Sequence, residues 1–206
     1  MIPTYSYYTL NIKLYTINIK RFSPDQQTPK DIDVLYVGAL RPRKQVDKII
    51  IAFSELIKKK SNVRLGIVGN GFLENELKSL VEDIGITENV HFFGFQKDVL
   101  PFLKRAKIFI MASKMEGLPV ALMEAMACEN TVIAPAVDNI PTVLIDKRTG
   151  YLMNSTSQEV VNKTLIEAYN NFHKDLHIRR SAREMIIDNY SYQSAISKWS
   201  SLLNNF

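Results

Sequence analysis

Five short apolar runs, each followed by a helical pattern, constrain the fold of this chain more than any other feature. They cover residues 33–38, 63–69, 89–94, 108–113 and 131–135. Apolar runs of about five residues that alternate with helices indicate βα units, whose parallel strands are buried on both faces. Because the crossovers of such units are right-handed, we predict an α/β fold with a doubly wound parallel sheet. The remainder, from Ser155 to Leu203, is predicted to form two or three C-terminal helices.

Glycines gather where the predicted strands end. Gly38, Gly69, Gly71 and Gly94 each follow or close an apolar run, and Ser113–Gly117 follows another. Ligands of doubly wound sheets bind outside the carboxyl ends of the strands. We therefore expect a binding site at this rim.

The composition narrows the class of protein. Hydrophobic residues make up 46% and charged residues 23%, as in an ordinary globular domain, and no apolar run reaches the roughly 18 residues of a membrane helix. The single cysteine, Cys128, excludes an internal disulfide and fits a reducing compartment, so we expect a cytoplasmic protein. The net charge of +5 comes without a basic block interleaved with aromatic residues, and we expect no nucleic-acid partner. His173 and His177 lack a third ligand nearby, so we expect no metal site.

Two glutamates, Glu116 and Glu124, stand eight positions apart around a Gly-Leu-Pro. If a helix begins near Pro119, eight positions span about 12 Å. The paired carboxyls of retaining glycosidases lie about 5 Å apart, and those of inverting glycosidases lie under about 10 Å apart. The helix N-terminus between them suits a phosphate. We therefore favour two contacts on one elongated ligand, made of sugar, diphosphate and ribose, over a hydrolytic pair or two solvated charges.

The stretch "EGLPVALMEAMAC" resembles the E-x7-E signature of the retaining GT-B glycosyltransferases of family 4, also called group 1. The resemblance continues through "LYVGALRPRK" and "LGIVGNGFLENEL", similar to the first two strands and their loops, and "NVHFFGF", similar to the base-contacting strand. It implies one half of a GT-B fold, the Rossmann-like domain that binds the donor. On this basis residues 1–30 are a linker or a remnant of the interdomain segment, 31–190 the nucleotide-sugar donor-binding domain, and 191–206 a C-terminal helix.

The resemblance also implies residue roles. Glu116 would lie at the donor sugar, Glu124 on the ribose hydroxyls and Lys44 at the diphosphate, with Glu116 and Lys44 as the catalytic residues. The other donor-binding positions are Gly38, Arg41, Arg43, Phe95, Gly117, Leu118 and Val120. The implied reaction transfers a sugar from a nucleotide diphosphate sugar to a hydroxyl with retention, without metal or cofactor, by stabilising the leaving diphosphate. Its setting is polysaccharide, glycolipid or glycoprotein assembly.

Several positions depart from the family pattern. The usual Gly-Arg after the first strand is Gly38-Ala39, and we expect Arg41 or Arg43, close to Lys44, to take over the phosphate contact. The glycine usual after the lysine is Gln45, and the glutamate that often follows Ile-Pro is Thr142.

The resemblance covers only the donor domain, so the implied partners are a nucleotide sugar and a separate chain that supplies the acceptor domain, unless the gene is truncated. The alternative is a non-catalytic nucleotide-sugar-binding module that partners or regulates a synthase. The N-terminus, rich in Tyr and Lys, is compatible with peripheral contact at the inner membrane face, but we favour a remnant of the interdomain strand and linker.

Overall fold

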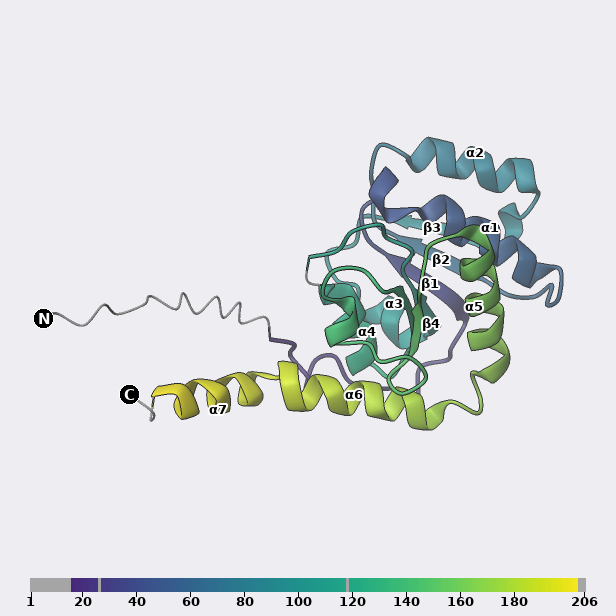
Figure 1. The fold of residues 1–206 in the computed structure, drawn as a ribbon. Helices are drawn as coiled ribbons and strands as arrows, with labels where there is room; N and C mark the ends of the chain where they lie inside the picture. Colours follow the sequence, from purple (N-terminus) through teal and green to yellow (C-terminus); the bar gives the residue numbers. More distant parts are fainter. Residues whose placement is uncertain (1–15, 26, 118, 204–206) are drawn as a thin grey trace, which may run out of the picture.

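The sheet is parallel and doubly wound, as predicted. The computed structural model describes residues 16–25, 27–117 and 119–203. The predicted N-terminal remnant up to residue 15, and Leu118, which was predicted to bind the donor, lie outside these residues. Six parallel strands follow the order β3-β2-β1-β4-β5-β6 (Figure 1). They are β1 (Ile32–Val37), β2 (Leu65–Val68), β3 (Val90–Gly94), β4 (Ala106–Ile110), β5 (Thr131–Pro135) and β6 (Tyr151–Met153).

Helices cover both faces of the sheet. One face packs against α1 (Val46–Ile57), α2 (Glu74–Ile84) and α5 (Gln158–Asn171). The other packs against α3 (Leu100–Arg105), α4 (Val120–Ala127) and α6 (Leu176–Tyr190). Successive strand residues point to opposite faces, so Val34 and Tyr36 join the first core while Leu35 joins the second. This double burial explains why the strands are apolar runs.

The loops after β1, β2 and β3 meet through glycine backbone. Gly69 has φ +130°, and a Cβ added there would lie 1.9 Å from the Gly38 carbonyl oxygen. A Cβ at Gly71 would lie 2.2 Å from the carbonyl oxygen of Leu40. The amide of Gly38 donates to Val68 O at 2.9 Å, and that of Gly69 donates to Gly94 O at 2.8 Å. The glycine rim is therefore one continuous backbone surface, which side chains would have pushed apart.

The C-terminal helices hold the segment before the sheet. Ile17 and Phe22 are buried, and the Ile17 amide donates to Tyr190 O at the end of α6 at 2.7 Å. From α6, the Arg183 guanidinium donates to Phe22 O at 3.0 Å and also to the Ala127 carbonyl at the end of α4. Beyond it, α7 (Tyr192–Leu203) extends away from the sheet (Figure 1). Within the described residues, no helix has both the length and the apolar character needed to cross a bilayer.

Candidate functional site

The residues predicted to be catalytic lie in contact. Lys44 ends the short 3-10 helix η1 (Pro42–Lys44) after β1, and Glu116 lies in the loop of residues 113–119, hereafter the Glu116 loop. The Lys44 ammonium donates to Glu116 Oε1, and the Ser113 hydroxyl donates to the same oxygen at 2.5 Å. Both charged side chains are largely buried, with 12% and 8% of their surface exposed. The carboxylate is thus fixed in place by two donors.

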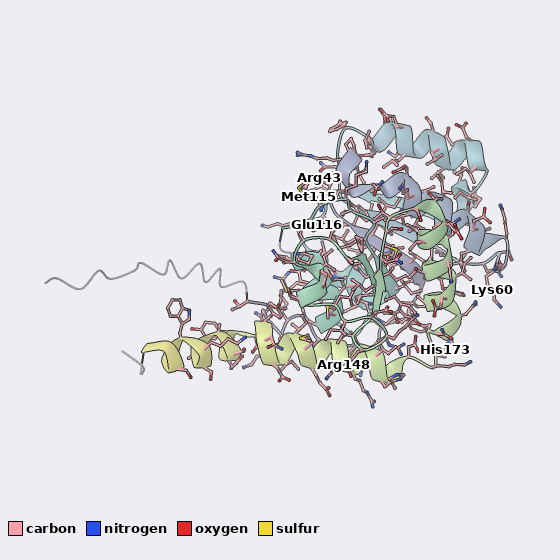
Figure 2. All side chains as sticks on the ribbon, viewed as in Figure 1. Arg43, Lys60, Met115, Glu116, Arg148 and His173 are labelled. Atoms are coloured by element: carbon pink, nitrogen blue, oxygen red, sulfur yellow. The ribbon has the colours of Figure 1, made fainter. Side chains whose placement is uncertain are left out.

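Arg41 and Arg43 are both exposed, and Arg43 reaches the same loop. The Arg43 guanidinium donates to Met115 O at 3.4 Å, and its own carbonyl accepts from the Lys114 amide at 2.8 Å. Figure 2 shows Arg43, Met115 and Glu116 gathered at one edge of the molecule. Of the two arginines predicted to compensate for Ala39, Arg43 is therefore the one beside Lys44 and Glu116.

Tyr36 supports the turn in which Ala39 replaces the family's arginine. Its hydroxyl donates to the Ala39 carbonyl at 2.9 Å, and a Cβ on Gly38 would lie 2.6 Å from that hydroxyl oxygen. Burial raises the pKa of the Tyr36 hydroxyl well above its usual value, and the negative charge of Glu116 raises it further, while Arg43 opposes the shift. Tyr36 thus stays neutral and serves as a hydrogen-bond donor under the loop.

The helix that carries Glu124 begins at the rim. Pro119 is the N-cap of α4, so Val120 is in the first turn, where backbone N–H groups have no partner within the helix. Their partial positive charge favours an anion beside the Lys44–Glu116 pair. Gly117 is exposed just before this turn, with open space where a Cβ would stand.

Glu124 has different neighbours from Glu116. It is half-buried in α4, and burial raises the pKa of its carboxyl; Asp98 adds to the rise, while Arg21 opposes it. Arg21 and Asp98 form an ion pair of 2.8 Å. Phe95, predicted to meet the base, is 70% exposed directly after Gly94 at the end of β3. The two glutamates therefore occupy separate electrostatic environments.

Asp138 is a residue of this rim that the sequence reasoning missed. It follows β5, and its Oδ2 accepts from the Glu116 amide at 2.6 Å. Its only signal in the sequence was an acidic residue at the carboxyl end of a predicted strand, where ligands of such sheets bind.

Other cavities of the molecule lie away from this rim. Hollows of about 460 and 500 Å³ lie at the amino ends of the strands, lined among others by Arg64, Asn89 and Lys107. The helix N-termini of βα units point to the opposite end of the sheet, and this favours the rim as the anion site. In the part of the chain that the structure describes, no three His, Cys, Asp or Glu side chains are grouped so as to hold a metal ion. Cys128 is buried, and burial raises the pKa of its thiol to about 12.

Known proteins resemble this chain in sequence and in fold. A poly(ribitol-phosphate) α-N-acetylglucosaminyltransferase of Staphylococcus aureus is 28% identical over 172 residues, which are 82% of this chain and 35% of the relative. The structure of HepE from Anabaena with UDP superposes with a TM-score of 0.82 at 16% identity, over 93% of this chain and 56% of that one.

A separate domain structure matches almost end to end. The C-terminal domain of a group 1 glycosyl transferase from Francisella tularensis matches over 85% of this chain and 99% of its own length, with a TM-score of 0.77 at 21% identity. By contrast, the chain spans 35% and 48% of two curated relatives that it matches. Residues 18–185 match the sequence profile of the glycosyl transferases group 1. The chain belongs to the group 1 glycosyltransferase family.

Proposed function

We propose that this chain binds a nucleotide diphosphate sugar as the donor half of a retaining glycosyltransferase. The observation that carries the proposal is the cluster of Lys44, Glu116 and Ser113 beside the N-terminus of α4. It combines a lysine and free backbone amides, which suit a diphosphate, with an oriented carboxylate, which suits sugar hydroxyls. Family membership favours a transferase over a non-catalytic binding module.

In the proposed reaction the chain stabilises the departing diphosphate. Negative charge grows on the leaving oxygen as the bond to the sugar breaks, and Lys44, Arg43 and the first turn of α4 supply positive charge there. With those groups on the diphosphate, we expect no metal ion or cofactor. The Glu116 carboxylate would orient the sugar, since its engagement with Lys44 and Ser113 suits it to hydrogen bonding rather than to nucleophilic attack.

The acceptor and the setting of the reaction are proposed by analogy with a relative. The Staphylococcus aureus relative, by its name, acts on poly(ribitol-phosphate). By analogy we place this chain in polysaccharide, glycolipid or glycoprotein assembly, in the cytoplasm or at the inner membrane face. Transfer would also need an acceptor-binding domain facing this donor half.

The first test identifies the nucleotide. Thermal shifts with UDP, GDP, ADP and their sugar conjugates should reveal one preferred base, since a ligand at 100 times its dissociation constant adds about 2.7 kcal/mol of stability. No shift with any member of the panel would contradict the proposal.

The second test separates the two glutamates by calorimetry. Glu124→Gln should weaken the free diphosphate and its sugar conjugate alike, because both carry the ribose. Glu116→Gln should weaken only the conjugate. Each loss should be roughly 1–3 kcal/mol, since a charged acceptor is replaced by a neutral one.

The control is Glu76→Gln, on the exposed face of α2, which should change neither affinity. Identical behaviour of the Glu116 and Glu124 variants would show that the two carboxylates do not hold different ends of one ligand.

A further inference from the structure

The loop after β5, residues 136–139, holds the Glu116 loop through two hydrogen bonds. Asp138 Oδ2 accepts from the Glu116 amide at 2.6 Å, and Asn139 Nδ2 donates to the Gly117 carbonyl at 3.3 Å. Both bonds fall on the backbone that carries the proposed sugar-binding carboxylate. Neither partner belongs to the residues already assigned to the donor.

The β5 loop is itself fixed to the core. The Ala136 amide donates to Met153 O in β6 at 2.7 Å. At its other end, the Ile140 amide donates to Val137 O at 3.0 Å, and the Ile140 side chain is fully buried. The Thr142 hydroxyl donates to Asn139 O at 2.7 Å. A contact from this loop therefore ties the Glu116 loop to the sheet.

The Glu116 loop needs such support. Lys114, Met115 and Gly117 are exposed, and a Cβ on Gly117 would meet nothing within 4 Å. Packing therefore does little to restrict this backbone, and hydrogen bonds must do so instead.

The backbone of Asp138 indicates why an acidic residue stands there. Its φ of 47° lies in the left-handed region, which glycine adopts with the least strain and which Asp and Asn tolerate better than other residues. What an aspartate offers at this position and a glycine does not is an oxygen that accepts from the Glu116 amide.

We propose that Asp138, assisted by Asn139, is a positioning residue for the donor sugar. By holding the Glu116 amide it sets the direction of the Glu116 carboxylate, while Lys44 and Ser113 hold the carboxylate itself. This inference rests on the proposed function, because the carboxylate matters here only as a contact to the sugar.

Two variants with compatible backbones isolate the acceptor oxygen. Asp138→Gly accepts the left-handed conformation but removes the oxygen, whereas Asp138→Asn accepts it and keeps one. Calorimetry with UDP and UDP-N-acetylglucosamine should show that Asp138→Gly weakens the sugar conjugate by about 10-fold and spares UDP. Asp138→Asn should retain the wild-type affinity for both. Wild-type affinity of Asp138→Gly for the conjugate, or equal losses for both ligands, would overturn the proposal.

Amide hydrogen exchange without ligand tests the hydrogen bond directly. The Glu116 amide should exchange faster in Asp138→Gly than in the wild type, and at the wild-type rate in Asp138→Asn. The matched control is Asp146→Gly, which removes a carboxylate that accepts from the Leu152 amide at 3.0 Å; it should leave Glu116 unaffected. Unchanged exchange at Glu116 in Asp138→Gly contradicts the positioning role. If the wild type binds neither UDP compound, the choice of donor fails, and the exchange rates still decide whether Asp138 holds the loop.

Discussion

At the scale of single residues, the Lys44–Glu116 pair shows how two largely buried charges hold each other in place. Removing two charges from water is costly, and a buried pair repays that cost only when further hydrogen bonds complete it. Here Ser113 supplies such a bond to the carboxylate. A bound diphosphate would offer Lys44 a second anionic partner. The pair thus keeps both groups oriented, and on the proposed function Lys44 would turn to the diphosphate when the donor binds.

Gln45 shows how a departure from the family pattern is accommodated. It stands where the family usually has glycine, and its φ of 49° and ψ of 46° are left-handed. The hydrogen bonds of its buried side-chain amide compensate for the strain of this backbone. The amide nitrogen, oriented toward Ala112 O and Thr156 Oγ1, donates to each at 2.9 Å, and the amide oxygen accepts from Lys48 Nζ at 3.0 Å.

Substitutions at Gln45 should separate strain from hydrogen bonding. Gln45→Gly relieves the left-handed strain, whereas Gln45→Ala keeps it, so the alanine variant should be the less stable of the two by about 1 kcal/mol. Both should be less stable than the wild type, since leaving a buried polar group unpaired costs about 1–3 kcal/mol. Urea denaturation measures all three free energies of unfolding. Equal stability of the two variants would show that the backbone at this position is not strained.

The ionised Glu124 carboxylate should lower the free energy of unfolding when no ligand is bound. Burial raises the pKa of its carboxyl, so the folded state binds the proton more tightly than the unfolded state. Stability then falls as the pH rises from the unfolded pKa through the raised folded one. Glu124→Gln should therefore melt at a higher temperature than the wild type at pH 7, and this advantage should disappear below pH ~4. Calorimetric melting at both pH values tests this, and an equal gain at both would exclude titration of Glu124 as the cause.

At the scale of elements, the meeting of the β1 and β2 loops depends on Gly69. A Cβ there would overlap the Gly38 carbonyl, at 1.9 Å, and φ of +130° disfavours any other residue. Gly69→Ala should therefore lower the free energy of unfolding by about 3 kcal/mol or more. The backbone would have to move to relieve the overlap, and the alanine would also hold a strained φ. Gly85→Ala is the matched control: φ is +77°, nothing lies within 4 Å, and the cost should be about 1 kcal/mol. Comparable denaturation midpoints for the two variants would contradict the close-approach argument.

The elements could be predicted from the sequence because their signals are local. The apolar runs and helical spacings lie within short windows, and burial on both faces of the sheet makes the strands apolar throughout. The glycine rim was predictable for the same reason, although the contact of Gly69 with Gly38 was not.

Contacts between distant residues had no comparable signal. Lys44 and Glu116 were each assigned through the family resemblance, but that resemblance describes ligand contacts and not the ion pair between them. The bond from Asp138 to the Glu116 amide depends on how β4 and β5 place two loops side by side. A single sequence contains nothing that fixes that distance.

At the scale of the whole molecule, the sheet and its helices have the extent of a C-terminal domain that was crystallised on its own. The Francisella tularensis domain is matched over 99% of its length. In this chain α7 leaves the body of the domain (Figure 1), and its Tyr192, Ile196 and Trp199 side chains are exposed. On the proposed function, donor binding should be a property of this unit alone, whereas transfer should also need an acceptor-binding surface.

The isolated 206-residue chain should accordingly bind a nucleotide diphosphate and transfer no sugar. Binding needs only the rim, where Lys44, Glu116 and α4 come together, whereas transfer also needs a surface that holds the acceptor hydroxyl against the donor sugar. A saturating nucleotide should raise the melting temperature by about 5–10 °C. Incubation of the same chain with the preferred nucleotide sugar and candidate lipid or polysaccharide acceptors should release no nucleotide beyond the rate seen with Glu116→Gln. Transfer by the purified chain would show that its own residues position the acceptor, and the proposal that transfer needs an acceptor-binding domain beyond this donor half would then be wrong.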